Sequence, residues 1–124
     1  MKQALATAQA PAAIGPYSQG IAAGQTVYVS GQPPIDPATG AIPEGIAAQT
    51  AQSLKNIQAI LAEQGMTLAD VVKTTVFLAD MNDFAEMNKV YGEYFAQPFP
   101  ARSAVQVAKL PKGAPLEIEC IAVK

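Results

Sequence analysis

The sequence predicts an α+β fold in which a mixed sheet carries two helices on one face. Three observations lead to this prediction. Segments rich in β-branched residues alternate with two amphipathic segments in the order ββαβαββ. Two helices can cover only one face of a sheet. The strand segments carry apolar residues on both faces, so the uncovered face needs a partner, which indicates a homo-oligomer.

The length and the charge set limits on the organisation of the chain. With 124 residues we expect a single domain over residues 1–124. Charged residues make up 15% of the chain, against roughly 25% in typical soluble domains. The net charge is −2 and no Lys/Arg cluster occurs, which argues against a nucleic-acid partner.

The absence of histidine narrows the possible chemistry. Cys120 is also the only cysteine. These facts exclude an intrachain disulfide, Ser-His-Asp and Cys-His nucleophile pairs, and the usual zinc ligand sets except carboxylate-rich ones. No apolar run resembles a secretory signal or a membrane span. We therefore expect a cytoplasmic protein without a membrane partner.

The first third of the chain predicts a β-hairpin followed by an ordered loop. Residues 18–32 hold two β-prone runs around Ala23 and Gly24, with Val27 and Val29 on one face of the second run. Residues 33–45 contain four prolines and two glycines. Neither a helix nor a central strand can pass through such a segment.

The middle of the chain predicts a helix and a strand. From residue 46 to residue 64 apolar residues recur every three or four positions, and Gly65 follows at a natural C′ position. Residues 70–80 are dense in β-branched side chains, which favours a strand. Alternation puts four of them on one side: Val72, Thr74, Val76 and Leu78.

The last third predicts a second helix and two terminal strands. An apolar stripe over residues 82–97 indicates a helix that begins at Asp80 or Asn82 and stops before Pro98. Residues 102–110 and 115–124 alternate as strands and are joined by a short Pro/Gly turn.

Arg102 is the first candidate for chemistry. It follows a stiff proline turn and shares a strand face with Ala104, Gln106 and Ala108. A guanidinium in this position can bind a carboxylate or phosphate through two parallel hydrogen bonds. An arginine paired with a surface acid at a solvated strand end fits the same pattern.

The last strand carries two acids on one face. Glu117 and Glu119 share this face with Ile121 and Val123. A half-buried carboxylate there has a raised pKa and can act as a general acid or base. Charges that keep an edge strand from pairing explain the pattern equally well. Cys120 lies on the opposite, most apolar face and is interpreted as structural.

Four further residues are weaker candidates. Tyr17 stands between two glycines, where its ring can close over a pocket or simply pack in a loop. Ser30 and Gly31 end a strand, where exposed N–H groups can meet a ligand. Asn88 lies among the apolar residues of the second helix, and such a polar side chain more often binds a backbone group than a substrate.

Four segments resemble the reactive intermediate deaminase family, also called RidA or YjgF-like: IGPYSQG, VYVSGQPPIDPATG, VVKTTVFLADMNDFAEMNKVYGEYF and FPARSAVQVAKLPKGAPLEIECIAV. The resemblance covers nearly the whole chain. It implies a chorismate mutase-like fold, a homotrimer with ligand clefts between subunits, and no metal or organic cofactor. It also implies hydrolysis of short-lived enamines and imines, such as 2-aminoacrylate and 2-iminopropionate, to 2-keto acids and ammonia.

The resemblance further implies roles for individual residues. It makes Arg102 the group that binds the substrate carboxylate and Glu117 the acid that polarises the attacking water. The other implied substrate-binding residues are Tyr17, Ser30, Gly31, Asn88 and Ala104. Many family members have a cysteine at the position of Ala104, so a thiol has no role there in this chain.

Three other functions stay open on the sequence, and one of them, chaperone-like holding of other proteins, leaves no mark on it. A non-catalytic sensor of 2-keto acids would use the same cleft and keep Arg102 without needing Glu117. An endoribonuclease or translation inhibitor, an activity reported for some relatives, would need a basic surface that this acidic chain lacks.

Overall fold

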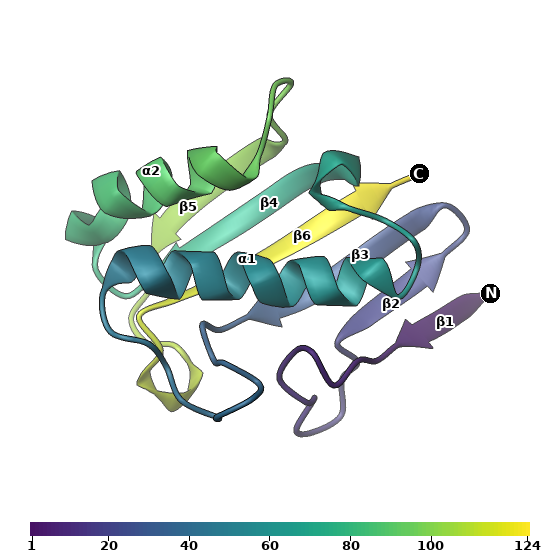
Figure 1. Ribbon diagram of the computed structural model, residues 1–124, viewed down its shortest axis with the longest axis horizontal. Helices are drawn as coiled ribbons and strands as arrows, with labels where there is room; N and C mark the ends of the chain where they lie inside the picture. The colour runs from purple at the N-terminus through teal and green to yellow at the C-terminus, as the bar shows by residue number, and fades with distance from the viewer.

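The computed structural model describes residues 1–124 and arranges six strands in one mixed sheet beneath two helices (Figure 1). The strands are β1 (Lys2–Leu5), β2 (Gly20–Ala23), β3 (Thr26–Gln32), β4 (Val71–Leu78), β5 (Ala101–Gln106) and β6 (Leu116–Val123). The helices are α1 (Ile46–Ala62) and α2 (Phe84–Tyr94), and short 3-10 turns cover Leu68–Asp70, Met81–Asp83 and Pro111–Gly113. The strand order across the sheet is β1-β2-β3-β6-β4-β5, and only β4 and β5 are parallel.

Both helices lie on the same face of the sheet, as predicted, and leave the other face open (Figure 1). The fully buried side chains of the core between the helices and the sheet include Leu54, Ile57, Ile60, Leu61, Val76, Leu78, Leu116 and Ile118. Burial of each such side chain is worth about 1.5–3 kcal/mol. Neither helix is long and apolar enough to cross a membrane.

The end of α1 confirms the prediction made for Gly65. Gly65 has a φ of 68°. Its N–H donates to the carbonyl of Ala62, and the N–H of Met66 donates to the carbonyl of Leu61, both at 3.0 Å. These two bonds form a Schellman motif, which requires the left-handed conformation that glycine adopts without strain.

The structure corrects the predicted elements in three places. β1 adds a strand at the edge of the sheet, and it buries only Leu5, so it is too short to show alternation. The prediction for Val72 is wrong: this side chain is 48% exposed. A bulge between Val71 and Lys73 places Val71 in the core instead. β5 ends at Gln106, before the predicted boundary at residue 110.

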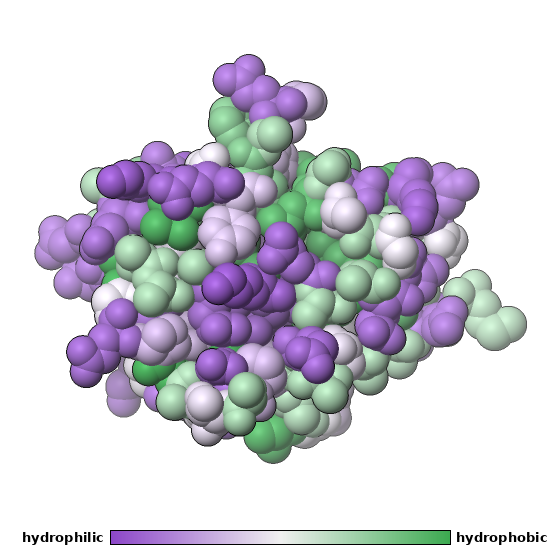
Figure 2. Space-filling view, viewed as in Figure 1, coloured by the Kyte–Doolittle hydropathy of each residue, from purple (hydrophilic) through white to green (hydrophobic).

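The open face of the sheet carries apolar side chains. The register of the strands places Tyr28, Phe77, Val105 and Ile121 on this face. Tyr28 is 50% exposed and Val105 is 42% exposed. On the helix-bearing side, by contrast, hydrophilic side chains gather over the helices in patches broken by apolar ones (Figure 2). The single chain therefore leaves an apolar sheet surface without cover.

Candidate active site

A cavity of about 570 Å³ lies beside Glu117. Three other predicted site residues, Tyr17, Ser30 and Gly31, line the same cavity. They come from separate segments of the chain: the loop before β2, the end of β3 and the start of β6. The structure thus brings together four of the residues that the sequence singled out.

A β-bulge directs Ser30 and Gly31 toward this cavity. The pairing of β3 with β6 shifts in register between Val29 and Gln32, so Ser30 and Gly31 interrupt the regular ladder. Gly31 also has no room for a side chain. An added Cβ would overlap Oε1 of Glu117 and lie 2.9 Å from its Cδ. The carboxylate of Glu117 therefore lies directly against the backbone of Gly31.

The environment of Glu117 favours its neutral form. Burial raises the pKa of Glu117 above its ordinary value, and the negative charge of Glu119 raises it further. Glu119 is exposed and lines the same cavity. A carboxylate whose pKa is shifted toward neutrality accepts a proton more readily than an ordinary glutamate, which suits a general base.

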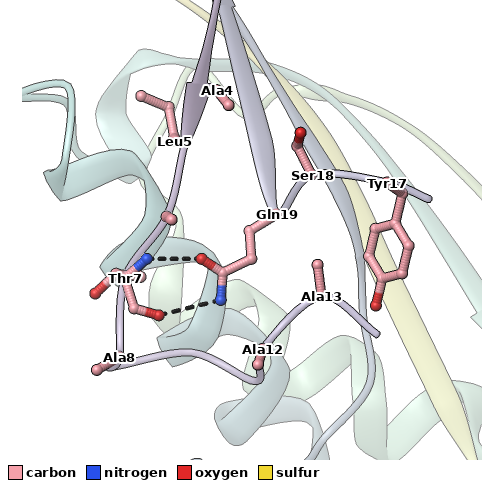
Figure 3. Close-up of a pocket in the computed structure, with 10 residues that line it drawn as sticks. Ala4, Leu5, Thr7, Ala8, Ala12, Ala13, Tyr17, Ser18 and Gln19 are labelled. Carbon is pink, nitrogen blue, oxygen red and sulfur yellow. Dashed lines mark hydrogen bonds between the residues drawn. The ribbon is translucent and has the colours of Figure 1, made fainter. Parts of the chain in front are cut away.

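Gln19 fixes the loop that carries Tyr17, a role that the sequence did not predict. Its side chain is only 4% exposed. Its Oε1 accepts from the N–H of Thr7 at 2.7 Å, and its Nε2 donates to the carbonyl of Thr7 at 3.1 Å (Figure 3). Nε2 also donates to the carbonyls of Ala10 and Pro11 at 3.3 and 2.7 Å. One buried amide thus ties the loop to the start of β2.

Arg102 lies on the other face of the sheet, against α2. Its guanidinium carbon is 4.8 Å from the ring centre of Tyr91 and 5.4 Å from that of Phe84. Nη1 donates to Oδ1 of Asn88 at 2.7 Å. Ala104, the next residue on this face, is half-buried and packs against the core. Aromatic faces and an amide oxygen hold the guanidinium without neutralising its charge.

The ring beneath Arg102 is itself held in place. The hydroxyl groups of Tyr91 and Thr74 are hydrogen-bonded at 2.7 Å. Burial raises the pKa of Tyr91, while the hydrogen bond to Thr74 and the charge of Arg102 lower it in part. Tyr91 therefore stays neutral at physiological pH and offers Arg102 an uncharged π-face.

Arg102 and Glu117 lie on opposite faces of the sheet. Arg102 is paired in register with Thr74, and Glu117 is paired with Phe77. Positions 74 and 77 are an odd number of residues apart on β4, so their side chains point to opposite faces. Arg102 thus faces the helix layer and Glu117 faces the open side. The expectation that both contact one small ligand is not met within a single chain.

Cys120 is buried, as predicted. Its side chain is 3% exposed. Burial, followed by the charge of Glu119, raises the pKa of its thiol to about 12. No group of three or more His, Cys, Asp or Glu side chains is arranged so that it could hold a metal ion.

Comparison with known proteins places the chain among its relatives. Residues 7–124 match the model of the family described as Endoribonuclease L-PSP. The chain is 52% identical to the 2-iminobutanoate/2-iminopropanoate deaminase of Salmonella typhimurium, over all of this chain and 99% of the relative. It is 56% identical to a RutC family protein of Pyrococcus horikoshii, with the same coverage. The structure matches that of E. coli TdcF with bound serine with a TM-score of 0.93 and 48% identity, over 98% of each chain. Because these matches span nearly every residue, the chain belongs to the Endoribonuclease L-PSP family, the YjgF/RidA family that its motifs resemble.

Proposed function

We propose that this protein hydrolyses 2-imino acids, formed from enamines such as 2-aminoacrylate, to 2-keto acids and ammonia. The observation that carries the proposal is the carboxylate of Glu117, which has a raised pKa and lies against Gly31 in the wall of a cavity. The identity of 52% with a relative named as an iminobutanoate and iminopropanoate deaminase, over the full chain, supports the same reaction.

A second copy of the chain completes the site, in a homotrimer of chorismate mutase-like fold. Arg102 and Glu117 face opposite sides of one sheet, so a small ligand can contact both only between two copies. The apolar side chains of the open face, among them Tyr28 and Val105, give such an assembly a surface to bury. In this assembly Arg102 of one copy reaches the Glu117 cavity of the next.

Arg102 binds the substrate carboxylate through charge-assisted hydrogen bonds, and Asn88 holds the guanidinium in position. E. coli TdcF was solved with bound serine, whose carboxylate and adjacent nitrogen are also present in a 2-imino acid. This likeness supports a ligand of the same size and polarity. Tyr17, Ser30 and Ala104 form the nearby walls in this assembly, and Ala104 contributes no reactive group.

Glu117 orients a water molecule and takes a proton from it as the water oxygen bonds to the imine carbon. This proton passes to the nitrogen and gives a carbinolamine. Glu117 then takes the proton of the carbinolamine hydroxyl and passes it to the same nitrogen, so that the C=O bond forms as the carbon–nitrogen bond breaks, ammonia leaves and the keto acid remains. General base catalysis of this kind contributes about 10²- to 10⁴-fold in rate. The alignment of water and substrate adds to it.

Mixing two inactive variants tests the enzyme and the shared site together. A serine dehydratase generates 2-aminoacrylate in the assay, and the decay of the imine is followed with and without the protein. We expect Arg102→Ala and Glu117→Gln each to lose activity. Co-refolding them restores about a quarter of the sites, because each site takes its arginine and its glutamate from different copies. Lys55→Ala, an exposed cation on α1, serves as the matched control.

Each negative outcome of this experiment contradicts a different part of the proposal. A mixed preparation no more active than its parents contradicts the site between copies. A wild-type protein that leaves imine decay unchanged contradicts the enzyme. If that inactive protein still binds 2-oxobutanoate, and Glu117→Gln binds it equally well, the non-catalytic sensor is favoured instead.

The description of the family also names an endoribonuclease. The cavity carries two carboxylates and one lysine, and the whole chain has a net charge of −2. Both features disfavour tight binding of a polyanion. Cleavage of RNA by wild type that persists in Glu117→Gln and Arg102→Ala would identify a separate activity at another site.

A further inference from the structure

Lys112 adopts a backbone conformation that side chains avoid. Its φ is 61° and its ψ is 19°, and no other residue except glycine has a positive φ. It lies in the turn between β5 and β6, followed by Gly113 with a φ of 64°. Glycine adopts this left-handed conformation without steric strain, whereas lysine does not. Strained positions of this kind concentrate at functional sites.

The strained turn places Lys112 in the wall of the Glu117 cavity. Lys112 and its neighbour Pro111 both line this cavity, and Lys112 is its only cationic lining residue. Lys73 and Lys124 donate their ammonium groups to carbonyls of the chain. No such bond ties Lys112, whose side chain is exposed. Its charge is therefore available to a ligand that enters the cavity.

The other charges that line the cavity are both negative. Glu117 and Glu119 face the same space, and together they repel an approaching carboxylate. Charges near the mouth of a cleft mainly change the rate at which a charged ligand arrives, and salt screens them over about 10 Å at 0.1 M. One ammonium group beside two carboxylates offsets this repulsion where the ligand enters.

We propose that Lys112 captures the carboxylate of 2-imino and 2-keto acids as they enter the Glu117 cavity. The inference rests on the proposed function, because Arg102 of another copy binds the carboxylate once the substrate is seated. Lys112 acts on the binding of the incoming substrate and not on the hydrolysis of the bound imine. Its loss therefore lowers kcat/KM and leaves kcat unchanged.

Four variants separate this role from a structural one. Lys112→Gly removes both the charge and the strain, and Lys112→Asn removes the charge but tolerates the left-handed conformation. Lys112→Arg keeps the charge. Lys109→Asn removes a nearby cation that does not line the cavity. For each variant, kcat and KM for 2-iminopropionate are measured at low and high salt together with the Tm.

We expect Lys112→Gly to raise the Tm and yet lower kcat/KM about 3- to 10-fold at low salt, with the difference shrinking at high salt. Lys112→Asn shows the same kinetic loss, while Lys112→Arg and Lys109→Asn stay near wild type. Neutral variants with wild-type kcat/KM at low salt, or a loss of equal size in Lys109→Asn, overturn the proposal.

The binding of 2-oxobutanoate, measured by titration, keeps the two proposals separate. If wild type proves inactive, the proposed reaction fails, but Lys112→Asn must still weaken the binding of 2-oxobutanoate at low salt. A second outcome refutes only the role of Lys112. In it wild type is active and Arg102→Ala is inactive, while the neutral Lys112 variants keep the wild-type kcat/KM and the wild-type affinity for 2-oxobutanoate.

Discussion

Glu117 and Arg102 are both charged side chains at the surface of one sheet, yet the fold holds them by different means. Glu117 lies against the bare backbone of Gly31, and burial raises its pKa. Arg102 rests on the rings of Tyr91 and Phe84 and donates to an amide. A general base needs an environment that makes its proton exchangeable, whereas an anion-binding group must keep its full charge. The position of Glu117 depends on the shape of the backbone, and that of Arg102 depends on neighbouring side chains. Different substitutions are therefore expected to impair the two residues.

Apart from loss of the general base itself, the largest effect is expected from Arg102→Ala. Loss of the charge proposed to bind the substrate carboxylate lowers kcat/KM by about 10²- to 10³-fold, because the carboxylate loses its charge-assisted hydrogen bonds. Arg102→Lys recovers part of this loss, since it restores the charge without the planar fork or the stacking on Tyr91. Imine decay under single-turnover conditions measures both. Full activity in Arg102→Lys would show that the fork is not used.

Gly31→Ala tests the backbone support of Glu117. The new Cβ overlaps the carboxylate, and a shift of about 1 Å in a catalytic group costs up to about 10²-fold in kcat. Gly92→Ala is the matched control, because no atom lies within 4 Å of the added Cβ in α2. That variant should keep wild-type activity and gain about 0.5–1 kcal/mol of stability. Equal kcat in both variants would argue against a carboxylate fixed by the bulge.

The pH profile of kcat/KM tests the cause of the shifted pKa. Glu117 acts as a base when ionised, so its raised pKa places the loss of activity on acidification at a higher pH than for an ordinary glutamate. Glu119→Gln removes one of the two causes and moves this acid limb to lower pH. An unchanged limb in Glu119→Gln would leave burial as the whole cause.

The same shift has a consequence for stability. Because the folded pKa of Glu117 lies above its unfolded value, its proton stabilises the fold below the unfolded pKa, and this contribution is lost as the pH rises through the folded pKa. Glu117→Gln is therefore expected to be inactive and more stable than wild type at neutral pH. Denaturant titrations at acidic and neutral pH measure the difference.

Tyr91→Phe is expected to have the smallest effect on catalysis. It keeps the ring beneath Arg102 and removes only the hydroxyl that bonds to Thr74. The free energy of unfolding falls by about 1–2 kcal/mol, because the buried Thr74 hydroxyl loses its partner. Activity stays within about twofold of wild type, since no charge or ring contact is lost. A tenfold loss of activity would give the phenol a direct role.

Local alternation was sufficient to predict much of the fold and the strand faces of the candidate residues. It put Val27 and Val29 on one face of their strand, and both are buried, and it separated Glu117 from the buried face of Cys120. These are properties of one strand, and each strand shows its own period of two. β1 escaped prediction because four residues with one buried side chain show no period.

The pairing between strands could not be predicted from the alternation within each strand. Arg102 and Glu117 each had a predicted face, but whether those faces coincide depends on how β4 pairs with β5 and with β6. Asn88 was expected to bind a backbone group on pattern alone, and it binds Arg102, fourteen residues away. Gln19 gave no signal beyond a polar residue at the start of a strand. Contacts between elements set all three outcomes.

The burial of Cys120 bears on how the protein withstands oxidants. Because burial raises its pKa to about 12, the thiol stays protonated at pH 7, and the thiolate is the form that peroxides and alkylating agents attack. Position 104, beside Arg102 on its strand face, is an alanine and carries no thiol. The proposed chemistry uses a guanidinium, an ammonium group, carboxylates, amides and hydroxyls, none of which is redox-active. Catalysis is therefore expected to continue under oxidative stress that silences enzymes with an exposed thiol.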